Sequence, residues 1–275
     1  MSTTFDSAAY QDVWDKLKEY IQNIDDYLTN DAPDAISAGQ NSYATKVTPG
    51  LSEFIKTCGE KMLAALKWLW EKLMDLIEGI AAPIFMAQRS FEWSDAKGDY
   101  SGVAAAINPK QLLALKEWKG DAQEAYEKTV EAQRDAILKM EETAETCRNH
   151  LMVAAAAGLL LYAGVAIVVN KFVTALAFII AAVASGFGAV PGFAGFWTIS
   201  GVTAAELSAA IAAITLFVTD QAKAWSDIKA ATTNNSAFQK GDDGSIRWPD
   251  PNTKYFEDAS VEGDNESKWR LNPDK

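Results

Sequence analysis

The side chains that most often carry catalysis are few and scattered in this 275-residue chain. His150 is the single histidine, which argues against a histidine metal site and against a Ser-His-Asp triad. Cys58 and Cys147 lack the C-x-x-C spacing, so a disulfide between distant helices and two buried thiols both remain open. The short acidic pairs Asp25-Asp26 and Asp242-Asp243 are typical of solvated surface rather than of metal sites.

No P-loop, dinucleotide-binding fingerprint, G-x-S-x-G elbow or EF-hand loop occurs in the sequence. The sequence therefore predicts a protein that is not an enzyme and that binds neither a cofactor nor a metal. Its 37 acidic and 25 basic side chains give a net charge of −12. This charge predicts no nucleic-acid partner, because no basic stripe is present to displace phosphate counterions. It also argues against electrostatic docking onto anionic lipid.

Charge almost disappears between residues 151 and 219, where Lys171 and Glu206 are the only charged side chains. The uncharged run Leu151–Val169 is long enough to span a bilayer as a helix. A second apolar helix is expected over 202–230. Together these two arms predict a helical hairpin, across which the two charged side chains could pair.

The hairpin is expected to turn at a flexible tip, 186–197, because glycines, a proline and aromatic residues alternate there. Aromatic side chains displayed at such a tip suit a membrane interface. The residues predicted to contact a membrane or other subunits are Leu160, Ile167, Lys171, Ile179, Phe187, Phe193, Phe196, Trp197 and Glu206.

Three environments remain open for the hairpin. It inserts into a membrane as in α-helical pore-forming proteins, it is buried between subunits of a homo-oligomer, or it folds back on the helices of 6–88 as an ordinary core. The many alanines do not decide between them, because alanine contributes little transfer free energy and favours close packing in lipid and protein alike.

The elements that precede the hairpin are also expected to be helical. A helix over 6–30 is expected to be capped by Asp6. A connection over 31–50, with a weaker helical possibility across 33–47, leads to a longer amphipathic helix over 51–88. Residues 89–107 contain glycines and aromatic residues and predict a loop or hinge. Asn108-Pro109 then predicts the start of a short helix that ends near Trp118.

A tight helix–turn–helix is predicted at Trp118-Lys119-Gly120. Gly120 can adopt the left-handed conformation that ends one helix, and Asp121 can cap the next with Glu124 as its capping-box partner. Trp118 is expected to cover this turn, and Tyr126 to pack one helical turn along. From Asp121 no glycine or proline occurs before Gly158, and a helix reaching about residue 185 would be roughly 100 Å long.

The pattern W-x-G-x-A-x-x-A-Y at 118–126 resembles the WxG-motif family of type VII (ESX) secretion substrates, whose members are exported helical hairpins. The order of features over 108–230 is most similar to the ESX secretion-associated Esp proteins, in particular to EspA-like members. The resemblance implies export by a type VII machinery, together with a co-secreted WxG-family or Esp-type partner. The helix before Trp118 is shorter than a typical arm of that family, unless the helix over 51–88 supplies this arm.

The same resemblance implies an export signal, Tyr-x-x-x-Asp/Glu, after the second helix of the turn. The matching spacing in this chain lies upstream instead, at Tyr27 and Asp31, which are the candidate signal residues. The N-terminus has neither the basic nor the apolar segment of a Sec signal peptide. The expected location is therefore secreted or at the cell-envelope surface, by a route that reads no Sec signal.

The sequence as a whole predicts an all-α fold, an elongated helical bundle with a WxG-type helix–turn–helix and a long apolar helical hairpin. Four segments are expected: N-terminal amphipathic helices (1–107), the WxG turn with a charged helix (108–150), the apolar hairpin (151–231) and an acidic, largely disordered tail (232–275). The expected function is a non-enzymatic structural or interaction protein that self-assembles into an oligomer or filament. The alternative is a pore-forming effector that inserts the 151–219 hairpin into a membrane.

Overall fold

The computed structural model describes residues 6–119, 121–233, 236–251 and 270–271. The chain is all-α, a helical bundle with a long apolar hairpin, which is the fold class that the sequence predicts. Contacts divide the chain into two units. Unit 1 combines Met1–Ala87 with Met152–Asp220, and unit 2 combines Gln88–Leu151 with Gln221–Lys275.

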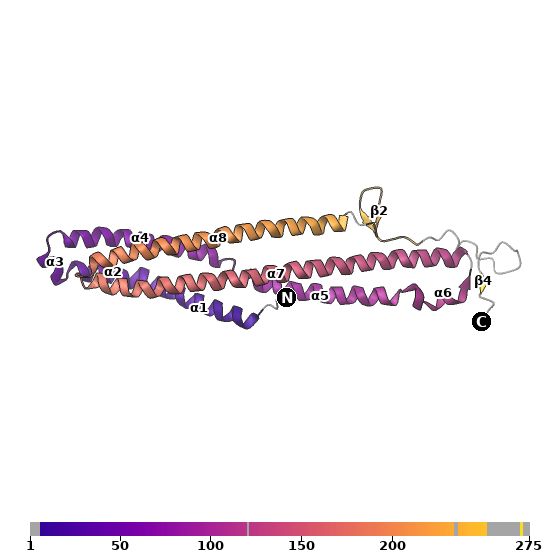
Figure 1. Cartoon of the computed structure of the whole chain (residues 1–275), viewed down its shortest axis with the longest axis horizontal. Coiled ribbons are helices and arrows are strands. Elements are labelled where there is room, and N and C mark those ends of the chain that lie inside the picture. Colours follow the sequence, from indigo (N-terminus) through magenta and orange to yellow (C-terminus); the bar gives the residue numbers. More distant parts are fainter. Residues whose placement is uncertain (1–5, 120, 234–235, 252–269, 272–275) are drawn as a thin grey trace. The chain divides into compact units, whose positions relative to one another are not determined.

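The helices follow one another with short connections (Figure 1). In chain order they are α1 (Ser7–Asp26), a π-helical turn (Tyr27–Asp31), α2 (Ala32–Gln40), α3 (Tyr43–Val47), α4 (Leu51–Ile77), α5 (Ala82–Ala106), a 3-10 turn (Pro109–Gln111), α6 (Leu113–Glu117), α7 (Asp121–Ala184) and α8 (Ala189–Thr233). Four two-residue strands complete the described elements: β1 (Trp118–Lys119), β2 (Gln239–Lys240), β3 (Ile246–Arg247) and β4 (Arg270–Leu271).

The first helix begins as predicted, because the Asp6 carboxylate accepts hydrogen bonds from the backbone N–H groups of Ala8 and Ala9 at 3.0 and 3.1 Å. The expected connection over 31–50 is instead mostly helical. Its α2 packs closely, since a Cβ at Gly39 would contact the backbone oxygen of Val183 on α7. The weaker helical tendency of these residues is therefore stabilised by tertiary packing.

Two predictions about the middle of the chain are wrong. The expected helix over 51–88 ends at Ile77, and a turn separates it from α5, with the Ala82 N–H donating to the Gly79 oxygen at 3.0 Å. The expected loop over 89–107 is helical, as part of α5. Its Gly98 and Gly102 have no neighbouring atoms within 4 Å of a would-be Cβ, so they mark neither a turn nor a close approach.

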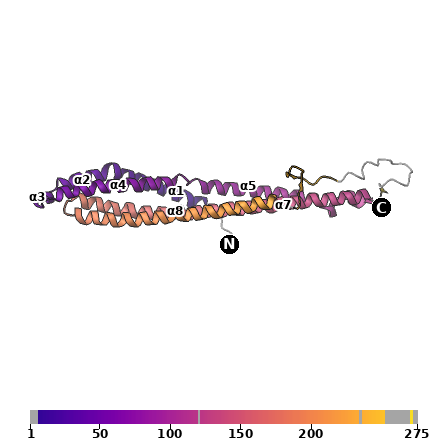
Figure 2. The ribbon, with the colours of Figure 1, turned by 90° about the horizontal axis from the view of Figure 1, so that it is seen from above.

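Unit 1 has two layers, with the hairpin formed by α7 and α8 on one side and α1, α2 and α4 on the other (Figure 2). The core lies between these layers and draws on both. Its largest fully buried side chains are Phe172, Phe193, Phe196, Leu17, Ile55, Met62, Leu66, Leu73 and Leu176. One side of the hairpin is therefore an ordinary protein core, which was the third environment left open by the sequence.

The hairpin turns within Ser185–Gly188, a much shorter tip than the predicted 186–197. Gly186 has a φ of 73°, and a Cβ there would contact the Ser42 hydroxyl oxygen, so the turn also lies against the residues that begin α3. Pro191 falls in the first turn of α8, where its missing N–H leaves no helical hydrogen bond unmade. A Cβ at Gly192 would lie 3.2 Å from Val183 Cγ2, so this glycine lets α8 approach α7.

In unit 2, α5 is held against α7 by polar contacts. The Arg134 guanidinium donates to the Ala104 oxygen at 3.3 Å, and Lys97 pairs with Glu145 at 3.1 Å. The tail predicted to be largely disordered has structure over 236–251, where β2 pairs antiparallel with β3. The Gln133 amide donates to the Pro249 oxygen at 3.3 Å, which places this small hairpin on α7.

Candidate functional site: the outer face of the helical hairpin

The hairpin of unit 1 has an apolar face turned away from the core. Every exposed α7 residue between 152 and 184, apart from Asn170 and Ala177, falls on a single row with alternating steps of three and four residues. We call its central part the α7 stripe: Leu160, Gly164, Ile167, Lys171, Thr174, Phe178 and Ala181. A step of this kind repeats every 3.5 residues on average, which is the period of a helix that packs along another helix.

A matching row runs along α8 beside its buried seam. The seam itself follows the same period and ends at Leu207. The neighbouring row is the α8 stripe: Gly195, Ile199, Val202, Glu206, Ala209, Ala213 and Leu216. All of these are exposed except Ile199 and Glu206, which are half-buried. Each stripe is thus apolar or small-sided with one charged residue at its centre.

The exposed apolar area on the hairpin is large for a single soluble chain. Phe178, Phe187 and Trp197 are 74%, 68% and 43% exposed. At 150–250 Å² for an aromatic side chain, these three alone leave about 280–460 Å² uncovered. This summed area is comparable to that of the largest apolar patch on a typical monomer, about 300–600 Å². Leu160 and Leu216, which are 75% and 70% exposed, add to the sum.

By length and composition, α7 and α8 are both long and apolar enough to cross a membrane. The most apolar 18-residue segment of α7 is 33% buried in the fold, and that of α8 is 11% buried. Most residues of these two segments are therefore not fully buried within the fold.

The structure separates the predicted contact residues into two groups. Leu160, Ile167, Lys171, Phe187 and Trp197 are exposed, and Glu206 is half-buried. The prediction is wrong for three others, because Ile179, Phe193 and Phe196 are buried in the core. The two phenylalanines belong to the first turns of α8 rather than to a displayed tip, and the close approach allowed by Gly192 brings that part of α8 against α7.

Three large, exposed apolar members of the stripes are missing from the predicted contact residues: Phe178, Val202 and Leu216. A signal for them exists in the chain. Counting in steps of three and four residues from Lys171 reaches Phe178, and counting in the same way from Glu206 reaches Val202 and Leu216. The single charge of α7 thus marks the row that faces away from the core, whereas the charge of α8 lies on a flanking row that also contacts the core at Ile199 and α7 at Gly195.

Lys171 and Glu206 do not pair within the chain. Both residues are described, and no ion pair joins them within the described part of the structure. Two apolar stripes therefore each carry a central charge that has no oppositely charged partner in the described part of this chain.

The WxG turn adopts a different local structure from the predicted one. Trp118–Lys119 forms strand β1, which pairs antiparallel with Arg270–Leu271 (β4). Gly120 lies outside the described residues, α7 begins at Asp121, Glu124 is exposed and Tyr126 is half-buried. The preceding α6 spans only Leu113–Glu117, and the long helix held against α7 in this unit is α5.

The candidate export-signal residues Tyr27 and Asp31 begin and end the single π-helical turn of the described residues. The Ala32 N–H donates to the Tyr27 oxygen five residues earlier, which closes this wider turn. Tyr27 is half-buried against the core of unit 1 and Asp31 is exposed. Both therefore belong to a continuous N-terminal helical segment.

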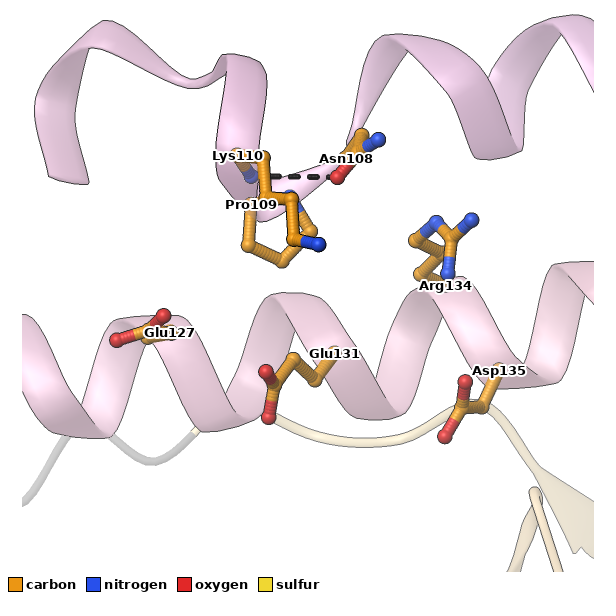
Figure 3. A pocket seen from close by; sticks show the side chains of 7 residues that line it. All are labelled: Asn108, Pro109, Lys110, Glu127, Glu131, Arg134 and Asp135. Atoms are coloured by element: carbon orange, nitrogen blue, oxygen red, sulfur yellow. Dashed lines mark hydrogen bonds between the residues drawn. The ribbon is translucent and has the colours of Figure 1, made fainter.

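Unit 2 contains an open polar groove of about 340 Å³ between the 3-10 turn and α7 (Figure 3). Asn108, Pro109 and Lys110 form one wall, with the Asn108 side chain accepting from the Lys110 N–H at 3.2 Å. The other wall carries Glu127, Glu131, Arg134 and Asp135 from α7. The acidic and basic side chains of these walls give a solvated surface, and no hydroxyl or thiol lies among the seven lining residues.

Both cysteines are free thiols, so the alternative of a Cys58–Cys147 disulfide does not hold. Cys147 is buried, and desolvation raises the pKa of its thiol, which keeps it protonated and unreactive. Comparison with known proteins adds no identity to this chain, because no family model, curated protein or solved structure matches it.

Proposed function

We propose that this chain is a secreted, non-enzymatic protein associated with type VII secretion, which self-assembles into a helical oligomer or filament at the cell envelope. The observation that carries the proposal is the exposed apolar face of the hairpin. Its exposed aromatic side chains sum to an area comparable to the largest apolar patch of a typical monomer, and its 3.5-residue period suits another helix. The WxG pattern at 118–126 supports the export route by resemblance.

The central charges favour a protein partner over lipid. A lysine near the centre of a bilayer costs about 2.5–3.5 kcal/mol on insertion scales, and Lys171 lies in the middle of the α7 stripe. A single charged or polar position within a helix–helix seam instead fixes its register at a modest cost in stability. The pattern of the stripe therefore fits subunit packing better than lipid.

Membrane insertion remains the second candidate function, and a specific observation favours it. Both helices of the hairpin have the length and apolar composition of membrane spans, and Phe187 at the turn is exposed. In this second candidate the soluble fold holds the hairpin until it meets a membrane, and the apolar face then contacts lipid.

Light-scattering mass, measured without detergent and then with liposomes of zwitterionic lipid, separates the two candidates. Assembly predicts a defined particle larger than the monomer before lipid is added. Insertion predicts a monomer that becomes liposome-bound. A protein that stays monomeric and does not bind the liposomes would contradict both candidate functions.

Charged substitutions then identify the surface. Leu160→Lys and Phe178→Lys should reduce the particle to monomers while leaving helix content by circular dichroism unchanged, because both side chains are exposed. Ala177→Lys is the matched control, since this exposed residue of α7 lies off the stripe. Ile179 is unsuitable for this test, because a charge at a buried position would report on folding.

Export is tested separately, by producing the full chain in an actinobacterial host with an intact or a disrupted type VII system. The protein is expected in the culture supernatant of the intact host only. Equal amounts in both supernatants would remove the type VII route from the proposal without affecting the assembly.

A further inference from the structure

The two stripes of the hairpin are complementary to each other. Lys171 lies fifteen residues before Gly186 in the turn, and Glu206 lies eighteen residues after Gly188. At a rise of 1.5 Å per residue, the two charges are about 22 and about 27 Å from the turn, a difference of one helical turn. They therefore lie at nearly the same level of the hairpin.

The residues around the charges continue this match. An α7 stripe and an α8 stripe can run antiparallel with Lys171 opposite Glu206. Each large side chain then lies opposite a small or another large apolar one, and no further charge lies at the contact. The pairs are Leu160 with Leu216, Gly164 with Ala213, Ile167 with Ala209, Thr174 with Val202, Phe178 with Ile199 and Ala181 with Gly195. Ile199 also packs against the core of its own chain and Gly195 lies against Ile179 of its own α7, so the match rests on the five levels from Leu160 to Thr174.

We propose that two copies of this chain dimerise through the outer faces of their hairpins, with both turns at the same end and Lys171 of each copy paired with Glu206 of the other. This inference rests on the proposed function and specifies one contact between subunits of the proposed assembly. The unpaired charges carry it, because each stripe is exposed or half-buried and its central charge has no ion-pair partner within the described chain.

A two-fold axis parallel to the helices produces this contact twice. Since the hairpin forms one layer of unit 1 (Figure 2), rotation about such an axis places α7 of one copy against α8 of the other, and the reverse. The interface is then self-complementary, with two equivalent Lys171–Glu206 pairs. A face-to-face arrangement with the turns at opposite ends would instead place α7 on α7 and α8 on α8, so that each charge would face a stripe carrying the same charge and no Lys171–Glu206 pair would form.

Charge reversal tests the pairing. Lys171→Glu places two carboxylates opposite each other at both contacts, and Glu206→Lys places two ammonium groups there. Each variant alone should dimerise at least about 30-fold more weakly than the original chain, because breaking a buried charge pair costs at least that factor in affinity. Both positions lie outside the core, so circular dichroism should show unchanged helix content.

A mixture of the two variants gives the decisive result. In the mixed dimer, the carboxylate introduced at position 171 of one copy meets the ammonium group introduced at position 206 of the other. The second contact keeps the original Lys171 and Glu206, so both contacts are again complementary. Equimolar mixing should therefore restore the dimer mass that neither variant forms alone. Lys67→Glu, the same charge change on the other layer of unit 1, serves as the control that leaves dimerisation unchanged.

The outcomes separate this inference from the proposed function. If the original chain assembles but the mixture stays monomeric, the Lys171–Glu206 contact is wrong and self-assembly stands on another surface. A rescue seen only when both reversals are in one chain would show an ion pair within the hairpin, and would also overturn the inference. If the original chain never self-associates at any concentration, the proposed function fails and the inference fails with it.

Discussion

The inner and outer faces of the hairpin are built from the same two helices and nearly the same residue types, yet the fold uses them differently. On the inner face, Phe172, Phe193 and Phe196 are buried against α1, α2 and α4. On the outer face, large side chains such as Leu160 and Phe178 stand in water at intervals, separated by small residues and one charge. The difference teaches that overall apolarity does not identify a core, whereas the spacing of large side chains and charges does.

The largest expected contrast comes from truncating one aromatic side chain on each face. Phe196→Ala should lower the free energy of unfolding by about 3–5 kcal/mol, because it leaves a cavity in a fully buried site. Phe178→Ala should change it by less than about 0.5 kcal/mol. Urea unfolding at a concentration where the chain is monomeric measures both, and similar losses would erase the distinction between the faces.

The turn of the hairpin offers the next largest effect. Gly186→Ala should destabilise the fold by about 2–4 kcal/mol, because its φ of 73° disfavours a side chain and a Cβ would contact the Ser42 hydroxyl oxygen. Gly201→Ala is the matched control on α8, where a Cβ meets nothing within 4 Å. This control should stabilise the helix by about 0.5–1 kcal/mol, and a loss there would show that the outer side of α8 is covered.

Alkaline pH should weaken the inner face selectively. Burial and, to a smaller extent, the neighbouring Tyr162 together raise the pKa of Tyr10 to about 12. The unfolded chain releases this proton near pH 10, so the stabilisation is complete below pH 10 and is lost as the pH rises towards 12. Unfolding measured at pH 9 and pH 11.5 should show this loss, and Tyr10→Phe should reduce it. An equal loss in the variant would assign the effect to other groups.

A smaller effect is expected where the inner seam of α8 carries a polar group. The Ser200 hydroxyl is buried and has no hydrogen-bond partner within the described residues. Ser200→Ala should therefore raise the free energy of unfolding by about 1 kcal/mol. Thermal melting of the two proteins side by side would detect the change, and a lower melting temperature would mean that the hydroxyl has a partner, such as a bound water.

Much of the fold follows from local patterns in the sequence. The Asp6 cap, the 3.5–3.6-residue period of the apolar residues and the long uninterrupted stretch after Asp121 predict α1, α4 and α7 because helix formation there needs no distant partner. Two of the errors occur where a glycine predicts a turn that does not form, whereas the break after Ile77 is a turn that the apolar period did not predict. Gly98 and Gly102 lie in open helix in α5, and Gly192 marks a close approach between helices.

The candidate site was only partly predictable for a related reason. Composition located the hairpin and its two charges, but the side of each helix that faces the core depends on its neighbours, which the sequence does not state. From the sequence, Phe193 and Phe196 are therefore expected at the surface, although α7 and the layer of α1, α2 and α4 cover them. The exposed Phe178 is missing from the expected contacts, although its spacing from Lys171 places it on the outer face.

The buried seam of α8 ends at Leu207, and none of the residues from 208 to 220 is buried. Amide hydrogens before this point should exchange with deuterium only when unit 1 opens as a whole, whereas those after it are protected by the helix alone and should exchange through local fraying. In a lone chain, amide exchange is thus expected to be slow in α8 up to Leu207 and fast after it. In an assembly that covers Leu216, exchange after Leu207 should become slow, so an exchange map of α8 reports how far the outer face is occupied.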